Sequence, residues 1–146
     1  MTAPAERLVG TWRLDDWARV DADGKRTPPL PGATGLITYT ADGFMFATLT
    51  GSGRKPFAGF DPMGGSAEET HHAMSTALSY CSYCGRWRME GDRLIHNVEL
   101  SMFPNWVGAE MTRTTRFEGD RAYVTTLPIT DNGKTFVFEL VLKRAS

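Results

Sequence analysis

The chain has 146 residues, which fits one domain with a core large enough to support itself. Hydrophobic residues make up 41% of it and charged residues 23%, ordinary globular usage that excludes a disordered or fibrous chain. The formal net charge is −1 and no basic run exceeds two residues, so nucleic acid is not expected as a partner. No apolar stretch could span a membrane and residues 1–10 lack the layout of a signal peptide, so we expect a cytoplasmic protein that binds no membrane.

Short segments that alternate polar and apolar residues, separated by turn residues, predict antiparallel β-structure along most of the chain. An Asp-Gly pair at residues 42–43 and Gly-Asp pairs at 91–92 and 119–120 lie between such segments and are typical of tight hairpins. The predicted strands are residues 9–20, 35–40, 44–50, 83–89, 93–102, 109–118, 121–127 and 135–142.

Eight strands of this kind predict an all-β fold, an up-and-down antiparallel barrel whose interior is wide enough for one small ligand. Closure also removes the exposed strand edges that favour aggregation. A sandwich of two sheets is the alternative architecture, because the strand list does not distinguish closed from open sheets.

One segment, residues 51–79, interrupts the strands with a Gly- and Pro-rich loop and a helix inserted after the third strand. Ser66 followed by acidic residues is typical of a helix N-terminus, and the helix is expected from about residue 67 to 79. Long loops in compact domains are often functional, so we interpret this segment as a lid over one barrel mouth. A fixed plug is the alternative. A short turn at residues 5–10 is expected to cover the other end.

Period-two alternation assigns side chains to the inner and outer faces of each strand. It places His96 and Val98 on the apolar face of the fifth strand, and Met111 and Arg113 on that of the sixth. The other inner-face residues are Trp12, Leu14, Tyr83, Trp87, Met89, Leu94, Leu100, Met102, Ala109, Thr115, Phe117, Phe136, Phe138, Leu140 and Leu142. The segments 35–40 and 44–50 are apolar on both faces, so their orientation stays open. Trp17 and Ile95 fall on outer faces and suggest an apolar patch for a homodimer.

An inward arginine needs an acceptor that offsets the loss of water. No acidic residue shares the inner faces of the fourth to eighth strands with Arg113. The acceptor is therefore either the ligand or one of Asp15, Asp16 and Glu99.

The two cysteines, Cys81 and Cys84, have the spacing of a redox pair or half a zinc site. A zinc site needs two more ligands, and adjacent His71 and His72 would point about 100° apart on a helix. We therefore interpret the cysteines as reduced thiols packed between a helix and a strand, and expect no metal site.

Five segments carry a resemblance to a known family: LVGTWRL at 8–14, GLITYTADGFM at 35–45, YxxYxG at 80–85, IHNVELS at 95–101 and FPNWVG at 103–108. Over nearly the whole chain they resemble the bacterial and fungal lipocalin-like domain proteins. The resemblance implies a closed barrel with a central cavity, and some members act as cyclases, isomerases or dehydratases in natural-product pathways. This chain has Leu142 where the family usually has tryptophan and Asn97 where a second histidine is common, which weighs against a mechanism needing a histidine pair.

One functional hypothesis is cofactor-independent acid–base catalysis on a bound polyketide-like or other apolar carbonyl compound, by cyclisation, isomerisation or dehydration. His96 would be the general acid or base, Tyr39, Tyr80 or Tyr83 would donate to a carbonyl oxygen, and Arg113 would stabilise an enolate. The predicted catalytic residues are His96, Arg113 and Tyr83. The predicted ligand-binding residues are Trp12, Tyr39, Tyr80, Trp87, Val98, Met111, Phe136 and Phe138.

The rival hypothesis is a carrier, in which His96 and Arg113 only bind the polar end of a small apolar ligand. Haem ligated by His96 is a third, weaker alternative. Neither of the first two hypotheses requires a metal or an organic cofactor.

Overall fold

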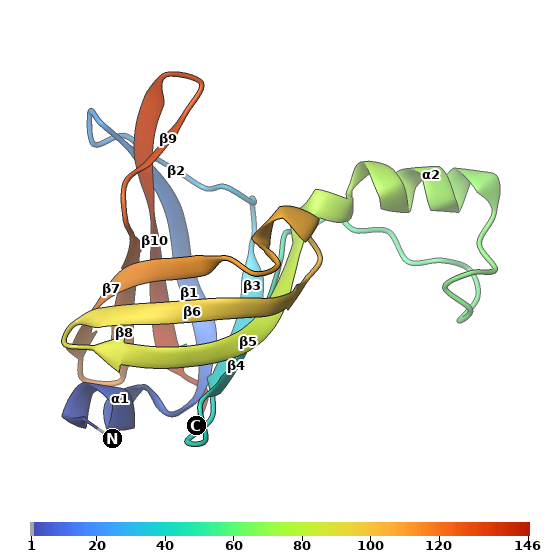
Figure 1. The fold of residues 1–146 in the computed structure, drawn as a ribbon. Helices are drawn as coiled ribbons and strands as arrows, with labels where there is room; N and C mark the ends of the chain where they lie inside the picture. Colours follow the sequence, from blue (N-terminus) through green and yellow to red (C-terminus); the bar gives the residue numbers. More distant parts are fainter. Residues whose placement is uncertain (1) are drawn as a thin grey trace.

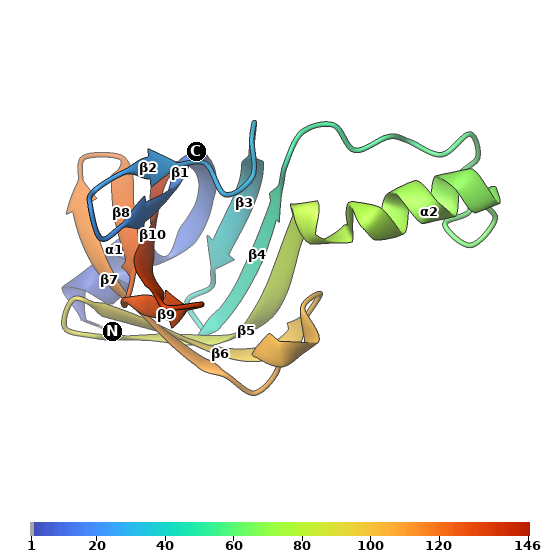
Figure 2. The ribbon, with the colours of Figure 1, turned by 90° about the horizontal axis from the view of Figure 1, so that it is seen from above.

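The computed structural model describes residues 2–146, which form one antiparallel sheet closed into a barrel (Figures 1 and 2). Closure comes from β1, which pairs with β3 on one side and β10 on the other. The long strands are β1 (Gly10–Asp21), β3 (Thr34–Tyr39), β4 (Phe44–Thr50), β5 (Tyr80–Glu90), β6 (Arg93–Ser101), β7 (Glu110–Glu118), β8 (Arg121–Thr126) and β10 (Lys134–Arg144). The predicted eight-stranded barrel is confirmed, and the two-sheet sandwich is wrong.

Two short strands extend the barrel at its open rim. β2 (Arg26–Thr27) pairs with β1, and β9 (Ile129–Asp131) pairs with β10. The hairpins between the long strands turn as the Gly signals predict. Gly91 and Gly119, with φ of +64° and +58°, take the left-handed conformation that favours glycine.

The opposite end of the barrel is covered by α1 (Ala3–Leu8), a helix of six residues where the sequence predicted a turn. Pro4 lies in its first turn, where a missing N–H costs nothing. Leu8 is fully buried, and its carbonyl accepts a hydrogen bond of 2.8 Å from Trp12 Nε1. The helix therefore closes this end of the barrel and holds the side chain of Trp12 against its last turn.

Two β-bulges change which residues face the interior. The pairing of β1 with β10 shifts between Leu14 and Asp16, and that of β5 with β6 shifts between Cys84 and Gly85. Each bulge adds one residue and so reverses the inside–outside order beyond it. Trp17 consequently lines the interior, although it was predicted outside.

Leu100 and Met102 were predicted to face inward, and both predictions are wrong. Their side chains are 69% and 46% exposed, because the bulge at Glu99 turns the end of β6 over. The predicted outer patch of Trp17 and Ile95 is also absent from the surface: Trp17 lines the interior and Ile95 is only 3% exposed. The homodimer prediction has no support from this patch.

Residues 51–79, called the arm here, contain α2 (Ala67–Ser75) and the 3-10 turn η1 (Ala77–Ser79). Ser66 and Glu69 each bond the other's backbone N–H at the start of α2, as the sequence predicts for a capped helix. The root of the arm is held to the barrel by the Gly51 N–H, which donates to the Ser79 carbonyl at 2.8 Å.

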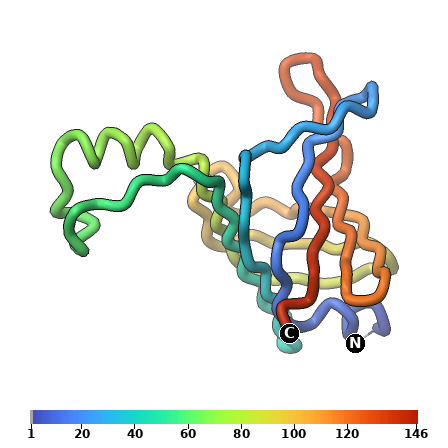
Figure 3. The backbone as a smooth tube through the Cα atoms, turned by 180° about the vertical axis from the view of Figure 1, so that it is seen from behind, coloured from blue at the N-terminus to red at the C-terminus, as the bar shows by residue number. Residues whose placement is uncertain are grey.

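The arm was predicted to lie over the barrel mouth, but α2 projects away from the barrel in both side views (Figures 1 and 3). No residue of α2 is buried, since its sequence, AEETHHAMS, offers no apolar stripe to pack on the rim. Among residues 2–146, no helix is long and apolar enough to cross a membrane.

Candidate functional site

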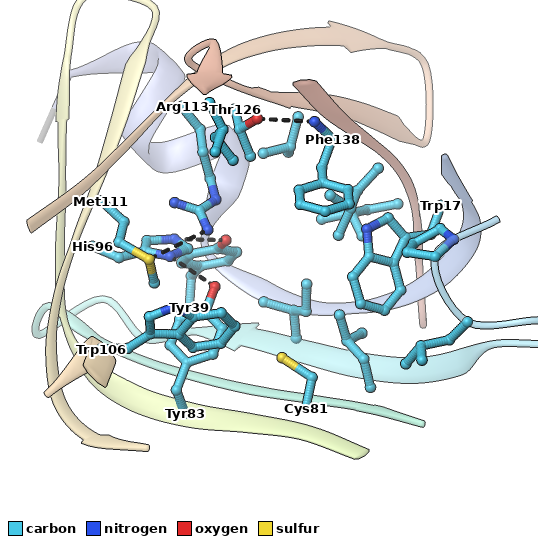
Figure 4. A pocket seen from close by; sticks show the side chains of 18 of the residues that line it. Trp17, Tyr39, Cys81, Tyr83, His96, Trp106, Met111, Arg113, Thr126 and Phe138 are labelled. Carbon is cyan, nitrogen blue, oxygen red and sulfur yellow. Dashed lines mark hydrogen bonds between the residues drawn. The ribbon is translucent and has the colours of Figure 1, made fainter. Parts of the chain in front are cut away.

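A cavity of about 330 Å³ lies inside the barrel, and its wall reaches Ile129 of β9 at the rim opposite α1. Figure 4 shows the side chains that line it. This lies in the size range of ligand pockets, roughly 300–1,000 Å³. The wall is mainly aliphatic and aromatic, and its polar groups gather at one side, around His96 and Arg113, while Trp17 and Phe138 lie across from them. The apolar wall includes Ile37, Leu49, Met111, Val124, Leu140 and Leu142.

His96 on β6 lies between two tyrosines that come from different strands. The hydroxyl of Tyr39, on β3, lies 3.1 Å from His96 Nε2, and the hydroxyl of Tyr83, on β5, lies 3.1 Å from Nδ1. His96 is only 2% exposed. Both ring nitrogens are therefore occupied, so neither is free to ligate haem iron or to reach a substrate directly in this arrangement. We call these three residues the tyrosine–histidine cluster.

The cluster is uncharged at neutral pH. Burial, together with the positive charge of Arg113, lowers the pKa of His96 well below its ordinary value. Burial raises the pKa of both Tyr39 and Tyr83, so both phenols keep their protons. A neutral imidazole is a donor at one nitrogen and an acceptor at the other. One tyrosine therefore donates to His96 and the other accepts from it, and the accepting tyrosine keeps a free O–H.

Arg113, on β7, reaches the same cavity and is partly buried. Within residues 2–146 its side chain makes one hydrogen bond, a weak one, in which Nη2 donates to Met111 Sδ at 3.9 Å. The carboxylates that the sequence offered as partners pair with other arginines on the barrel exterior. Those pairs are Asp15–Arg121, Asp16–Arg26 and Glu99–Arg86. The guanidinium consequently has no carboxylate partner in the described chain.

Six of the predicted site residues lie together on the cavity wall: Tyr39, Tyr83, His96, Met111, Arg113 and Phe138. Their roles in catalysis or binding remain predictions. Period-two alternation was sufficient to place His96 and Arg113 on inner faces, because β6 and β7 pair without a register shift at these residues.

Five predicted ligand-binding residues do not line the cavity. Trp12 is buried beside α1 at the floor, and Val98 is 3% exposed in the core. Trp87 packs edge-on against Tyr39, behind the wall, with ring centroids 5.3 Å apart. These three are core residues that do not line the cavity, because period-two parity separates inner from outer faces but does not show which inner residues reach the cavity.

Phe136 and Tyr80 miss the cavity for different reasons. Phe136 is 8% exposed at the rim, with the guanidinium of Arg19 3.7 Å from its ring centre. Tyr80 precedes Cys81, which lines the cavity, so it points outward, where Arg54 lies 5.2 Å from its ring centre.

Sequence reasoning did not assign several wall residues, among them Trp17, Cys81 and Trp106. Trp17 was hidden by the bulge in β1, and Cys81 was interpreted only as a packed thiol. Trp106, in the turn η2 (Pro104–Trp106), packs edge-on against Tyr83 with centroids 5.6 Å apart. Its place in the specific FPNWVG segment was the one signal that could have identified it.

The two cysteines lie on opposite faces of β5. Cys81 lines the cavity, whereas Cys84 pairs with the exposed residues Phe46 and Leu100 on the outside. Both are free thiols, as the sequence analysis expected. Opposite faces prevent the pair from acting as a dithiol without rearrangement of the strand.

Burial raises the pKa of Cys81 to about 11, so its thiolate is scarce at neutral pH. We expect iodoacetamide to alkylate Cys81 in a Cys84→Ser variant about a hundredfold more slowly than a free thiol near pH 8. The rate should rise about tenfold per pH unit until the fold fails. Mass spectrometry of the labelled peptide measures this, with the Cys81→Ser variant as the matched control. Labelling at the rate of a free peptide thiol would contradict the buried position.

The closed barrel and its interior cavity define a lipocalin-like architecture. The model of the lipocalin-like domain matches residues 9–145, and the chain belongs to this family. A 4'-hydroxy-3'-methoxypropiophenone carrier protein from Aspergillus oryzae is 31% identical over 84 residues, which cover 52% of this chain and 73% of that protein. A crystal structure of an uncharacterized protein from Bacteroides eggerthii aligns with a TM-score of 0.43 and 14% identity, over 91% of this chain and 98% of the other.

Proposed function

We propose that the protein is a carrier that holds one small aromatic carbonyl compound, or a molecule of similar shape, inside the barrel. The observation that carries this proposal is Arg113, a cation on the wall of an apolar cavity that has no carboxylate partner among residues 2–146. Partial burial of a cation without a partner costs free energy, and a ligand oxygen that accepts its hydrogen bonds offsets that cost.

The rest of the wall supports a ligand with an aromatic body. Trp17 and Phe138 lie across the cavity from the polar groups and suit the faces and edges of a ring. The relative from Aspergillus oryzae is named for carrying an aryl ketone, which combines such a ring with an acceptor oxygen.

Arg113→Met is expected to weaken binding of 4'-hydroxy-3'-methoxypropiophenone by about 10- to 100-fold, since one charge-assisted hydrogen bond contributes about 1.5–3 kcal/mol. Methionine keeps the length of the side chain and removes the charge. Isothermal titration calorimetry measures the affinity, and quenching of tryptophan fluorescence gives a second readout, because Trp17 and Trp106 line the cavity.

The matched control is Arg116→Met. Arg116 lies on the same strand but on the outside, paired with Glu118 and stacked on Tyr123. Wild-type affinity in this control, with loss in Arg113→Met, supports the proposal. No binding by the wild type across a panel of aryl ketones, or equal affinities in the two variants, contradicts it.

Cofactor-independent acid–base catalysis is a second candidate function, favoured by the presence of two phenols and a guanidinium in one cavity. Because both nitrogens of His96 are occupied, a tyrosine hydroxyl would touch the substrate and accept its proton while giving its own proton to one nitrogen of His96. The imidazole would stay neutral by releasing its N–H proton to the second tyrosine, whose own O–H proton would go to the carbonyl oxygen. Arg113 would then stabilise an enolate during cyclisation, isomerisation or dehydration. Mass spectrometry of candidate carbonyl compounds after incubation distinguishes the two functions: unchanged compound indicates a carrier, and conversion that is lost in Tyr39→Phe/Tyr83→Phe indicates catalysis.

A further inference from the structure

The polar side of the cavity is a positive site with no negative charge. Arg113 faces the tyrosine–histidine cluster, whose members lie on β3, β5 and β6, and the thiol of Cys81, which lies on β5. Its positive charge acts on all four groups. On the other side, β8 and β10 contribute only uncharged wall residues, among them Thr126. Every titratable group that Arg113 faces is therefore uncharged at neutral pH.

The hydrogen-bond inventory of this side is also one-sided. The cluster holds three protons, two on phenols and one on the imidazole, and uses two of them in its two internal hydrogen bonds. Within the described part of the chain, the remaining O–H has no acceptor, and the N–H groups of Arg113 have only the weak contact to Met111 Sδ. The site thus offers a positive charge and several donors to whatever oxygen enters.

We propose that the cavity binds its ligand as an oxyanion. The ligand is a phenol or an enol whose hydroxyl is conjugated with a carbonyl group. This hydroxyl loses its proton, and its oxygen lies against Arg113 and the free tyrosine hydroxyl. This inference rests on the proposed function and narrows the ligand class. An oxyanion satisfies the donors as a neutral oxygen does and also neutralises Arg113 in surroundings of low dielectric constant, where charge pairing is strongest.

The proton balance of this step is simple. The O–H bond of the ligand breaks, the electron pair stays on oxygen, and the proton leaves to solvent through the open mouth. His96 does not take the proton, because burial and Arg113 hold its pKa far below the ordinary value. Conjugation with a carbonyl matters because it lowers the pKa of the ligand hydroxyl, so that the further stabilisation from one nearby positive charge is enough to ionise it.

The test is a spectroscopic pH titration of bound 4'-hydroxy-3'-methoxypropiophenone, whose phenol and phenolate absorb at different wavelengths. We expect the pKa of the bound phenol to lie at least about one unit below that of the free compound, which means the anion binds at least about tenfold more tightly than the neutral form. Its methyl ether, 3',4'-dimethoxypropiophenone, cannot ionise and should bind correspondingly more weakly. Arg113→Met should abolish the shift, Arg113→Lys should keep its direction, and Arg116→Met should leave it unchanged.

The outcomes separate this inference from the proposed function. If the ketone binds but the bound phenol keeps or raises its pKa, or if the methyl ether binds equally well, the oxyanion inference is overturned and the carrier stands. If 4-methoxybenzoate binds more tightly than the phenol, the site is for carboxylates and the inference is again overturned. If none of these compounds binds, the proposed function fails as well.

Discussion

Gly85→Ala is expected to destabilise the barrel by about 3 kcal/mol, the upper end of what overpacking a core usually costs. A Cβ atom at this position would lie 2.0 Å from the carbonyl oxygen of Asn97 and 2.9 Å from the N of Glu99. Both contacts are backbone atoms of the neighbouring strand, so no side-chain rotation relieves them. The close approach arises because β6 bulges toward β5 at this position.

Urea unfolding measures the effect as a lower midpoint with an unchanged slope. Gly59→Ala is the matched control: it makes the same chemical change on the arm, where a Cβ would have no atom within 4 Å. We expect its midpoint to equal that of the wild type. Equal midpoints for all three proteins would show that β6 withdraws from position 85 at little cost, and would contradict the tight bulge.

The number and order of the long strands could be predicted because each hairpin carries its own local signal. Asp-Gly and Gly-Asp pairs between alternating segments specify a tight turn that joins two antiparallel strands, and this signal does not depend on the rest of the chain. The bulges carry no comparable signal. An extra residue at Asp15 or Glu99 is stabilised by the partner strand, so alternation continued past it assigns Trp17 and Leu100 to the wrong faces.

The arm shows a different limit. Its helix start was predictable, because the Ser66–Glu69 capping box is local. Its direction depends on whether α2 has an apolar face that matches the rim. A loop between β4 and β5 is compatible with a lid and with a projecting arm. The polar sequence of α2 favours the projecting arm, but this follows only when the residues that form the barrel rim are known.

The candidate site was predictable in part. His96 and Arg113 were placed inward because they stand among apolar residues on regular stretches of strand. The hydrogen bond between Tyr39 and His96 spans 57 residues and depends on the registers of β3 with β4, β4 with β5 and β5 with β6. An error in any one register would remove the contact, so the cluster could not be assembled from strand parity alone.

His96→Leu is expected to cost about 2–4 kcal/mol at neutral pH, because it leaves the buried hydroxyls of Tyr39 and Tyr83 without their shared partner. The triple variant His96→Leu/Tyr39→Phe/Tyr83→Phe, which removes all three polar groups, should recover part of that loss. Urea unfolding of the single and triple variants measures both. A triple variant less stable than His96→Leu would show that the hydroxyls find other partners.

The same substitution should also change the pH dependence of stability. Because the pKa of His96 is lowered in the folded state, the unfolded chain binds a proton at this residue that the folded chain does not, and stability falls as the pH drops below about 6.5. This residue alone contributes a slope of about 1.4 kcal/mol per pH unit there. His96→Leu should lose that slope, so its deficit against the wild type narrows toward pH 5, whereas His71→Leu, a change at an exposed position on α2, should keep it. A constant deficit from neutral to acid pH would mean that His96 is protonated inside the barrel, and the uncharged cluster on which the oxyanion site depends would be wrong.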